Sequence, residues 1–401
     1  MSENKLKLAI IGCGGMAGGH LRAYGLIKEK EPEKFEFSAM CDPVIESAKR
    51  FADQAAAYQG FKPTVYTKVE DMLRNEQLDA TDICTPHSEH HVAGIACLNA
   101  GVNVMIEKPI GITIRASKAI IEAGKKNRRL VATAENIRRG PSQRASYWLV
   151  NEAKLLGTPR LLYAQHASWH DPSVERIWHW RVDKMMGGGG MVMDSGAHFC
   201  DMIRYLYGDP ETIYAKVQQL EKWPHRKGDA IVMDDREDTW VATITFKGGV
   251  VGVWSWTIAA PGNTYTNVVH YGSKGCILDH GDAFHGPFGN AEVIIQDGPR
   301  RIVTPMSEVQ QQFLDQLSED EKNALFPHGF TEGVAIECYD FLDSVEKKRE
   351  PEVDGEEGMK AKAICEAIYE SAYIAQAVQY EDVLSGKVDE YQRPINEHYG
   401  L

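Results

Sequence analysis

The sequence has no apolar run near the roughly 20 residues that a membrane-spanning helix needs. The apolar run that begins at Leu8 is also too short for the core of a signal peptide, and glycines follow it at once. The eight cysteines are scattered and none forms a Cys-x-x-Cys pair, so we expect buried thiols rather than a disulfide framework or a zinc site. These absences predict a soluble, cytoplasmic protein with no membrane partner.

Positive charge is also scarce, because 44 Lys and Arg stand against 57 Asp and Glu and give a formal net charge of −13. Nucleic-acid binding needs a basic stripe that can pair with phosphates. The short basic runs here, at 125–126, 128–129 and 138–139, are typical of helix ends and loops. We therefore expect no nucleic-acid partner.

Over residues 1–136 the sequence alternates between short apolar segments and amphipathic ones. Strands are expected at 6–11, 35–41, 80–84, 102–106 and 130–134, and helices from residue 16, at 88–100 and at 113–127. Short strands that alternate with helices predict a parallel, doubly wound sheet within an α/β fold. We treat this segment as the first domain.

The pattern changes near residue 140. A helix is expected at 142–156, followed by longer strands at 160–168, 212–220, 239–247 and 250–259. Apolar residues occupy every second position within 239–247, which predicts an antiparallel sheet with two different faces. Helical stretches near 306–325, 330–348 and 356–379 close the chain. Residues 137–401 are therefore predicted to form a second α/β domain with an open, mostly antiparallel sheet.

A glycine-rich turn follows the first strand and fits the pattern Gly-x-Gly-x-x-(Gly/Ala), as Gly12-Cys-Gly14-Gly15-Met16-Ala17. Its place between a buried strand and a helix is the context in which this pattern binds a dinucleotide. Gly12 permits the tight turn, Gly14 lets the pyrophosphate approach the backbone, and Ala17 allows close packing of helix on strand. The helix N-terminus then offers N–H groups and a positive dipole end to the phosphates. A purely structural turn is the alternative.

An acidic residue, Asp42, ends the second strand. A carboxylate at this place can accept hydrogen bonds from both ribose hydroxyls and would repel a 2′-phosphate. Pro43 follows it, and no Ser-Arg or Arg-Arg pair is present there to bind such a phosphate. The sequence therefore predicts a Rossmann domain that binds NAD in preference to NADP.

Three further motifs follow in order, namely Thr85-Pro86-His87-Ser-Glu-His90, Glu107-Lys108-Pro109 and Met193-Asp194-Ser-Gly-Ala-His198. With the glycine turn and the segment 351–371, they resemble the glucose–fructose oxidoreductase/inositol dehydrogenase (Gfo/Idh/MocA) family. His87 departs from the family pattern, in which Asn commonly follows Thr-Pro. The resemblance spans nearly the whole chain. It implies an N-terminal Rossmann domain, a C-terminal domain with an open antiparallel sheet, and hydride transfer between a ring carbinol and a nicotinamide.

Oxidation of an alcohol needs a base for the hydroxyl proton and a donor for the developing oxyanion. Lys108 follows a parallel strand, where open α/β sheets bind ligands, and can donate to the reacting oxygen. His198 can accept a proton near neutral pH, and Asp194 shares its face if residues 192–205 are helical. By the resemblance, Lys108 and His198 share the reacting hydroxyl and Asp194 holds a neighbouring one. Ordinary surface charges are the alternative for each residue taken alone.

The remaining candidate residues surround this constellation. Besides the glycine turn, the residues expected at the cofactor are Asp42, Thr85, Pro86, His87, His90, Glu107 and Lys108. Glu107 is also expected to orient the loop of Lys108. The residues expected at the substrate, besides the catalytic three, are Asn136, Arg138, Trp169, His170, Trp178 and Trp180. Aromatic faces suit the apolar face of a pyranose, and imidazole suits its hydroxyls. No metal is expected, because the histidines at 87, 90 and 91 lack carboxylate or cysteine partners at ligand spacing.

Taken together, the motifs predict an NAD-dependent oxidoreductase that oxidises a ring hydroxyl of a sugar, glycoside or inositol-like polyol, with C3 of a glucoside as one candidate position. Two alternatives stay open. One is a glycoside-cleaving enzyme that oxidises its substrate transiently and recycles NAD, and the other is a nucleotide-sensing protein without catalysis. The resemblance, and apolar residues on both faces of the strands at 239–259, predict a homodimer or homotetramer.

Overall fold

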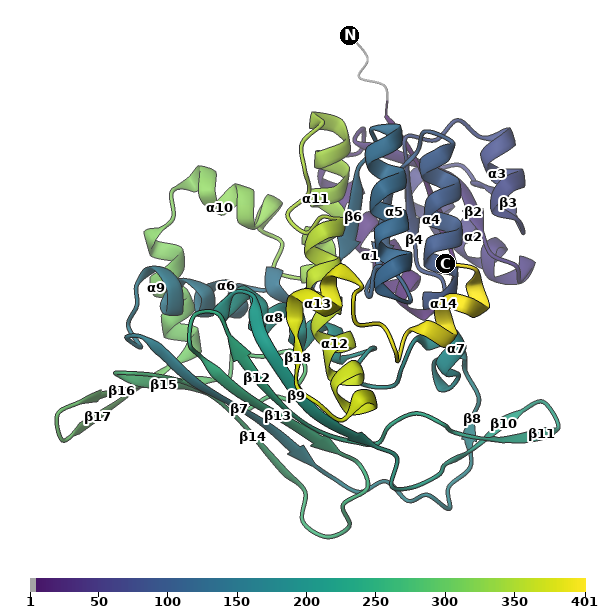
Figure 1. Cartoon of the computed structure of the whole chain (residues 1–401). Coiled ribbons are helices and arrows are strands. Elements are labelled where there is room, and N and C mark those ends of the chain that lie inside the picture. The colour runs from purple at the N-terminus through teal and green to yellow at the C-terminus, as the bar shows by residue number, and fades with distance from the viewer. Residues whose placement is uncertain (1–4) are drawn as a thin grey trace. The chain divides into compact units, whose positions relative to one another are not determined.

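The N-terminal strands form one parallel sheet in the computed structural model, which describes residues 5–401 (Figure 1). Its strand order is β3-β2-β1-β4-β5-β6, and every pair is parallel. The strands are β1 (Leu6–Ile11), β2 (Phe35–Cys41), β3 (Thr64–Tyr66), β4 (Ala80–Ile83), β5 (Asn103–Glu107) and β6 (Val131–Ala134). Helices cover both faces, so the central strands are almost continuously apolar and buried. The predicted doubly wound Rossmann sheet is confirmed.

The helices that connect these strands are α1 (Gly15–Lys30), α2 (Ile45–Gln59), α3 (Val69–Asn75), α4 (His87–Asn99) and α5 (Ile114–Asn127). α5 begins where the sequence predicted, because the Thr113 side chain accepts a hydrogen bond from the Ala116 N–H at 3.2 Å and caps the helix. A later helix, α11 (Gly333–Lys347), packs against α1 and buries Val334, Cys338 and Phe341 in the same core. The first compact unit therefore contains the residues up to Arg139 and also Asn323–Met359. The predicted domain boundary at residue 136 had assigned this later segment to the second domain.

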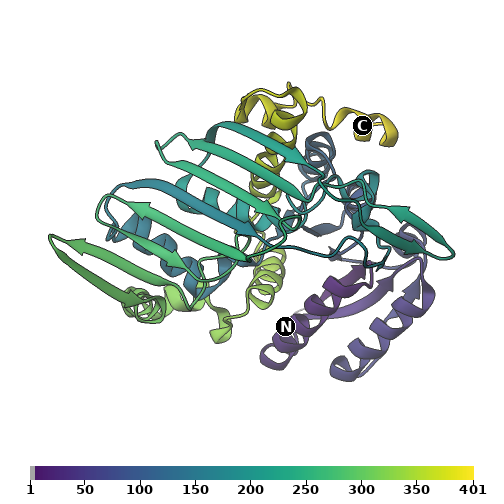
Figure 2. The same ribbon diagram turned by 90° about the horizontal axis from the view of Figure 1, so that it is seen from below.

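The second unit, Gly140–Lys322 with Lys360–Leu401, is built on a nine-stranded sheet, seen as a broad open layer in Figure 2. The order is β17-β16-β15-β14-β7-β13-β12-β9-β18, and all pairs are antiparallel except β13 with β7. Its strands are β7 (Pro159–Ala167), β9 (Pro210–Gln218), β12 (Thr239–Phe246), β13 (Val251–Thr257), β14 (Tyr265–Gly272), β15 (Gly275–Asp279), β16 (Glu292–Asp297), β17 (Arg300–Pro305) and β18 (Val378–Gln379). The predicted open, mostly antiparallel sheet is confirmed.

The two faces of this sheet differ, as the period-two pattern predicted. On the inner face Trp240, Ala242, Ile244 and Phe246 are buried, and the Phe199 ring of α8 (Gly196–Tyr207) packs on Trp254 at 4.8 Å. The outer face carries exposed apolar side chains, with 39–50% of the surface accessible at Leu161, Tyr214, Val241 and Tyr271.

The other elements of this unit are short. A separate three-stranded sheet contains β8 (Arg176–Ile177), β10 (Pro224–Lys227) and β11 (Ala230–Met233). The helices are α6 (Pro141–Tyr147), followed by a π-helical turn at Trp148–Glu152, and α7 (Lys184–Gly187), α9 (Met306–Gln316), α13 (Tyr380–Ser385) and α14 (Arg393–Tyr399). The helix predicted at 306–325 is interrupted, because α10 (Glu319–Leu325) starts anew after Leu317 adopts an extended conformation. α12 (Gly355–Ile374) ends at Ala375, whose φ is +56°.

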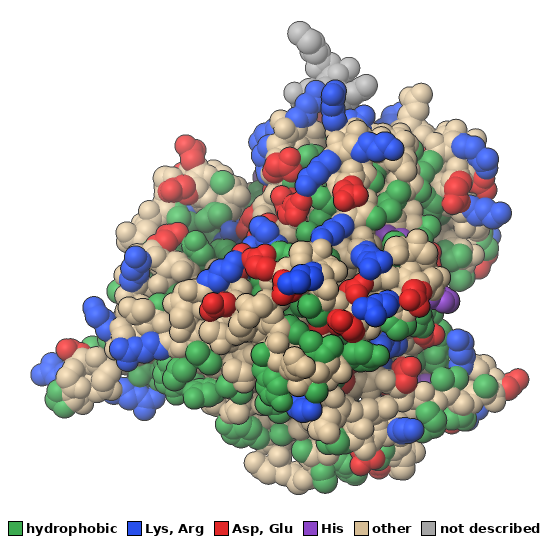
Figure 3. All heavy atoms as spheres, viewed as in Figure 1, with side chains coloured by type: hydrophobic (Ala, Val, Ile, Leu, Met, Phe, Trp, Pro, Cys, Tyr) green, Lys and Arg blue, Asp and Glu red, His purple; other side chains and the backbone are tan. Residues whose placement is uncertain are grey.

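Two surface findings bear on the partners. Within residues 5–401, no helix combines the length and apolarity that crossing a bilayer requires. On the face shown in Figure 3, Lys and Arg side chains are interspersed with Asp and Glu rather than gathered in a stripe.

Candidate active site

The glycine turn has the geometry that phosphate binding requires. Gly12 has φ +88°, and a Cβ atom there would lie 2.7 Å from the Cys84 carbonyl oxygen, so this position needs glycine. Gly14 and Gly15 have open space where a Cβ would be, and Met16 is exposed. Among the described residues no side chain caps the start of α1. The N–H groups of its first turn can therefore serve a bound anion.

Asp42 lies directly after β2, and its carboxylate is fixed beside the glycine turn. Oδ2 accepts a hydrogen bond from the Cys13 N–H and Oδ1 accepts one from the Val44 N–H, both at 2.8 Å. Each oxygen keeps a second lone pair. The carboxylate is thus oriented by the backbone and can still accept from ribose hydroxyls.

The loops after β4 and β5 are joined by a buried histidine. His90 of α4 is fully buried, with Nδ1 3.0 Å from the Pro109 carbonyl oxygen and Nε2 3.0 Å from that of Thr85. Burial lowers its pKa to about 4, so the ring is neutral at pH 7. His90 therefore stabilises the two loops that carry Thr85 and Lys108, and His87 beside it is buried too. Neither ring offers an exposed face to a ligand.

Five candidate residues follow strands of the parallel sheet at the carboxyl edge that also carries the glycine turn. Thr85 and Pro86 follow β4, Lys108 follows β5, and Asn136 follows β6, with Arg138 one turn later in the 3₁₀ helix Ile137–Arg139. Carboxyl ends of parallel strands form the ligand edge of a doubly wound sheet. The first unit therefore brings the predicted cofactor residues and Lys108 to one edge.

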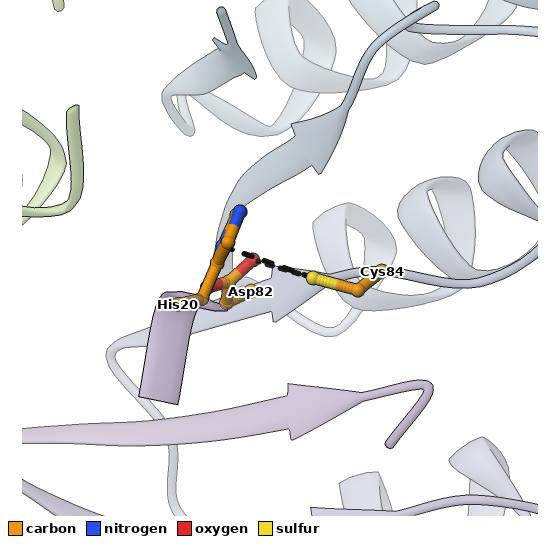
Figure 4. A group of neighbouring side chains, drawn as sticks. All are labelled: His20, Asp82 and Cys84. Carbon is orange, nitrogen blue, oxygen red and sulfur yellow. Dashed lines mark hydrogen bonds and ion pairs between the residues drawn. The ribbon is translucent and has the colours of Figure 1, made fainter. Parts of the chain in front are cut away.

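A buried polar cluster lies on the face of the parallel sheet that α1 and α11 cover. Figure 4 shows His20 of α1, Asp82 of β4 and Cys84 with their side chains directed toward one another. His20 Nδ1 is 2.8 Å from Asp82 Oδ2, and Nε2 is 2.9 Å from Glu107 Oε1. The Cys84 sulfur is 3.7 Å from the same Nδ1. Glu107 thus forms a buried hydrogen bond with His20, which fits the expected role of Glu107 in orienting the loop of Lys108.

A histidine, an aspartate and a cysteine within 4.8 Å are a possible metal-ligand set. In this cluster, however, carboxylates already engage both ring nitrogens of His20. Burial lowers the pKa of His20, but the charge of Asp82 and its hydrogen bond outweigh burial, so the pKa lies well above its ordinary value. We interpret the cluster as an imidazolium held between two carboxylates.

The turn before α8 carries Asp194, and the structure corrects the predicted helix there. α8 begins at Gly196 rather than at residue 192, because the preceding backbone forms a glycine-rich turn in which the Asp194 N–H donates to the Gly190 carbonyl at 3.0 Å. Asp194 therefore precedes the helix, while His198 lies in its first turn. The Asp194 carboxylate forms an ion pair with Arg181 at 2.9 Å.

Two residues remote in sequence hold this glycine-rich turn. The Glu237 carboxylate accepts hydrogen bonds from the N–H groups of Gly190 and Val192, each at 3.0 Å, and from the Tyr369 hydroxyl at 2.8 Å. A Cβ at Gly190 would collide with the Glu237 carboxylate. Sequence reasoning missed Glu237 and Tyr369, and the run Gly187–Gly190 is the one signal of such close approach.

Cationic side chains lie over two of the three candidate tryptophans. A Lys227 Nζ lies 3.7 Å from the Trp178 ring centroid, and the Arg181 guanidinium lies 4.3 Å from that of Trp180. His170 Nδ1 is 3.4 Å from an Arg176 nitrogen. Trp169 is 47% exposed, which leaves its indole as the most accessible of the three.

A second histidine lies beside His198. The ring centroids of His198 and His285 are 5.3 Å apart, and His285 Nδ1 is 2.9 Å from Asp282 Oδ2. Sequence reasoning missed His285 and Asp282, because neither belongs to a motif and both lie in a loop without hydrophobic periodicity.

Comparison with known proteins yields matches over both units. Residues 6–135 match the oxidoreductase family with an NAD-binding Rossmann fold, and residues 150–278 match the GFO/IDH/MocA C-terminal domain. Levoglucosan dehydrogenase of Pseudarthrobacter phenanthrenivorans is 27% identical over 68% of this chain and 73% of its own length. 1,5-Anhydro-D-fructose reductase of Ensifer adhaerens is 22% identical over 84% and 91%. A solved levoglucosan dehydrogenase in complex with NADH and L-sorbose superimposes with a TM-score of 0.74 at 23% identity, covering 94% of this chain and 99% of that one.

Proposed function

The chain belongs to the GFO/IDH/MocA family of NAD-binding oxidoreductases, and from this premise we propose that it oxidises a ring hydroxyl of a sugar, glycoside or inositol-like polyol. The observation that carries the proposal is the meeting of the glycine turn, Asp42 and Lys108 at one edge of the parallel sheet. A cation after β5 stands at the carboxyl edge of the parallel sheet, the edge at which doubly wound folds bind dinucleotides, and this supports a role for Lys108. Relatives that act on levoglucosan and 1,5-anhydro-D-fructose support a sugar-like substrate.

In the proposed reaction Lys108, His198 and Asp194 have the roles that the family resemblance implies. Lys108 donates a hydrogen bond to the reacting oxygen and stabilises its developing charge. His198 accepts the hydroxyl proton, and Asp194, oriented by Arg181, holds a neighbouring hydroxyl. A bound NAD would supply the hydride acceptor for the ring carbon.

The test is to incubate the purified protein with NAD and a panel of free sugars, glycosides and cyclitols, following NADH absorbance and product mass together. We expect NADH to accumulate in step with an oxidised ring product. Cleavage of a glycoside without net NADH would favour the NAD-recycling alternative. Absence of both products across the panel would contradict the proposal.

Asp42 is expected to set the preference for NAD. Asp42→Ala removes the acceptor for the ribose hydroxyls and the charge that repels a 2′-phosphate, so the KM for NAD should rise about tenfold or more. The KM for NADP should change less, so the difference between the KM values for NAD and NADP should become smaller. Asp53→Ala, on the exposed surface of α2, is the matched control. Wild-type protein that uses NADP as well as NAD would contradict this assignment.

We also propose that the outer face of the nine-stranded sheet joins copies of this chain into a homodimer or homotetramer. Exposed Leu161, Tyr214, Val241 and Tyr271 on that face form a patch typical of a covered interface. Light scattering at micromolar concentration should give at least twice the mass of one chain, and Val241→Glu should lower it. Phe61→Glu, at an exposed apolar site of the first unit, should leave the mass unchanged. A monomeric wild-type protein would contradict the proposal.

A further inference from the structure

The loop between β15 and β16 carries an imidazole that none of the sequence motifs includes. The ring of His285 lies 5.3 Å from that of His198, with 43° between the ring planes. Its side chain is 28% exposed, so it is accessible and not part of the core. The neighbourhood of the expected catalytic base therefore contains a second group that can bind a hydroxyl.

The protein core fixes the position of this loop. The Phe284 ring is buried against Trp240, Trp254 and Trp256, with centroid distances of 6.0, 6.0 and 5.7 Å. At the start of the loop, the Asp279 carboxylate accepts a hydrogen bond from the Gly281 N–H at 2.9 Å. His285 is thus held by packing on the inner face of the sheet, as a binding residue must be.

Asp282 fixes the orientation of the imidazole. Its Oδ1 accepts hydrogen bonds from the Phe284 and His285 N–H groups, each at 2.9 Å, and its Oδ2 lies 2.9 Å from His285 Nδ1. Burial raises the pKa of Asp282, but the hydrogen bond and charge of His285 outweigh it and lower the pKa overall. Because a carboxylate only accepts, the His285 proton lies on Nδ1. In the neutral ring, Nε2 then carries a lone pair that can accept from a hydroxyl.

We propose that His285, held by Asp282, is a further substrate-binding residue that takes the ring hydroxyl next to the one bound by His198. This inference rests on the proposed function and narrows its substrate class to rings with two free neighbouring hydroxyls. Vicinal hydroxyl groups lie side by side on a ring, and two adjacent imidazoles can each bind one of them. The bond to Arg181 meanwhile engages one oxygen of Asp194, which was the group first expected to hold this second hydroxyl.

The test compares His285→Ala with a matched histidine variant, His280→Ala. His280 is also exposed and paired with a carboxylate, Glu292 at 3.2 Å, and it lies at the start of the same loop. On the best ring substrate, His285→Ala should lower kcat/KM by about 10- to 100-fold, mainly through KM, because one substrate hydrogen bond is lost. His280→Ala should behave as wild type, and NADH binding, followed by fluorescence, should be unchanged in both.

A deoxy analogue separates binding from structural support. Wild-type protein should lose about the same 10- to 100-fold in kcat/KM on the analogue that lacks the second hydroxyl, and His285→Ala should lose nothing further on it. Equal losses on both substrates would assign His285 a structural role and overturn the inference, as would wild-type kinetics of His285→Ala. If the wild-type protein binds NADH but oxidises no ring polyol, the proposed function fails and this inference fails with it. An active wild type with an unaffected His285→Ala refutes the inference alone.

Discussion

His198→Ala is expected to lower kcat by about 10²- to 10⁴-fold, the usual contribution of a positioned general base. Lys108→Ala should give a loss of similar size, because the developing charge on the reacting oxygen then lacks its donor. Neither variant should change NAD affinity substantially. We expect the glycine turn and Asp42, the proposed sites for the phosphates and the ribose, to keep their geometry in both variants, because neither substitution alters the hydrogen bonds that fix Asp42.

The controls are His398→Ala and Lys322→Ala, which alter residues of the same types on α14 and on α10. Steady-state kinetics on an active sugar, with NAD binding measured in parallel, decides the assignment. If both site variants keep near-wild-type kcat, the chemistry belongs to other residues. A large loss of NAD affinity in either variant would mean that it acts on the cofactor and not on the hydroxyl.

Replacement of His20 is expected to have the largest effect on stability. His20→Leu leaves Asp82 and Glu107 without the imidazolium between them, and removing one partner of a buried charged pair costs about 3–5 kcal/mol. Denaturant unfolding monitored by fluorescence should show this loss. His20→Gln, which can donate to one carboxylate, should lose less, and His398→Leu on the surface should be neutral.

The stabilisation by His20 is also expected to depend on pH. Since its pKa is raised in the folded chain, its contribution is complete below the pKa of an unfolded histidine, about 6.5. The contribution is lost as the pH rises through the folded pKa. The difference in unfolding free energy between wild type and His20→Leu should therefore be largest near pH 6 and shrink in alkaline solution. A difference near zero at pH 6 would refute the imidazolium interpretation.

Local patterns in the sequence predicted the features that depend on neighbouring residues. The glycine turn, Asp42 after β2 and the period-two pattern of β12 each lie within one short segment, and the structure places them as expected. The predicted start of α8 was wrong, because the turn before the helix depends on Glu237. The Glu237 carboxylate accepts a hydrogen bond from the N–H of Gly190, which lies 47 positions away in the sequence. No local pattern reveals such a partner.

The same reason explains the other omissions. α11 returns to the first unit because Cys338 and Phe341 fit the core beside α1, and a helical pattern alone does not say which core a helix joins. His285 and Asp282 stand in a loop that is anchored by Phe284, so only the packed structure places them beside His198. The burial of β14 does not alternate, and the strands β15 to β17 have only five or six residues, with β17 largely exposed, so none of them has a clear period-two pattern.

Transfer of deuterium tests the central claim most directly. A ring substrate deuterated at the carbinol carbon is incubated with NAD, and the reduced cofactor is analysed by mass spectrometry. We expect one deuterium in the reduced nicotinamide and a slower reaction than with the unlabelled substrate. Reduced cofactor without deuterium, or label lost to water while the ring product forms, would contradict direct hydride transfer from the ring carbon.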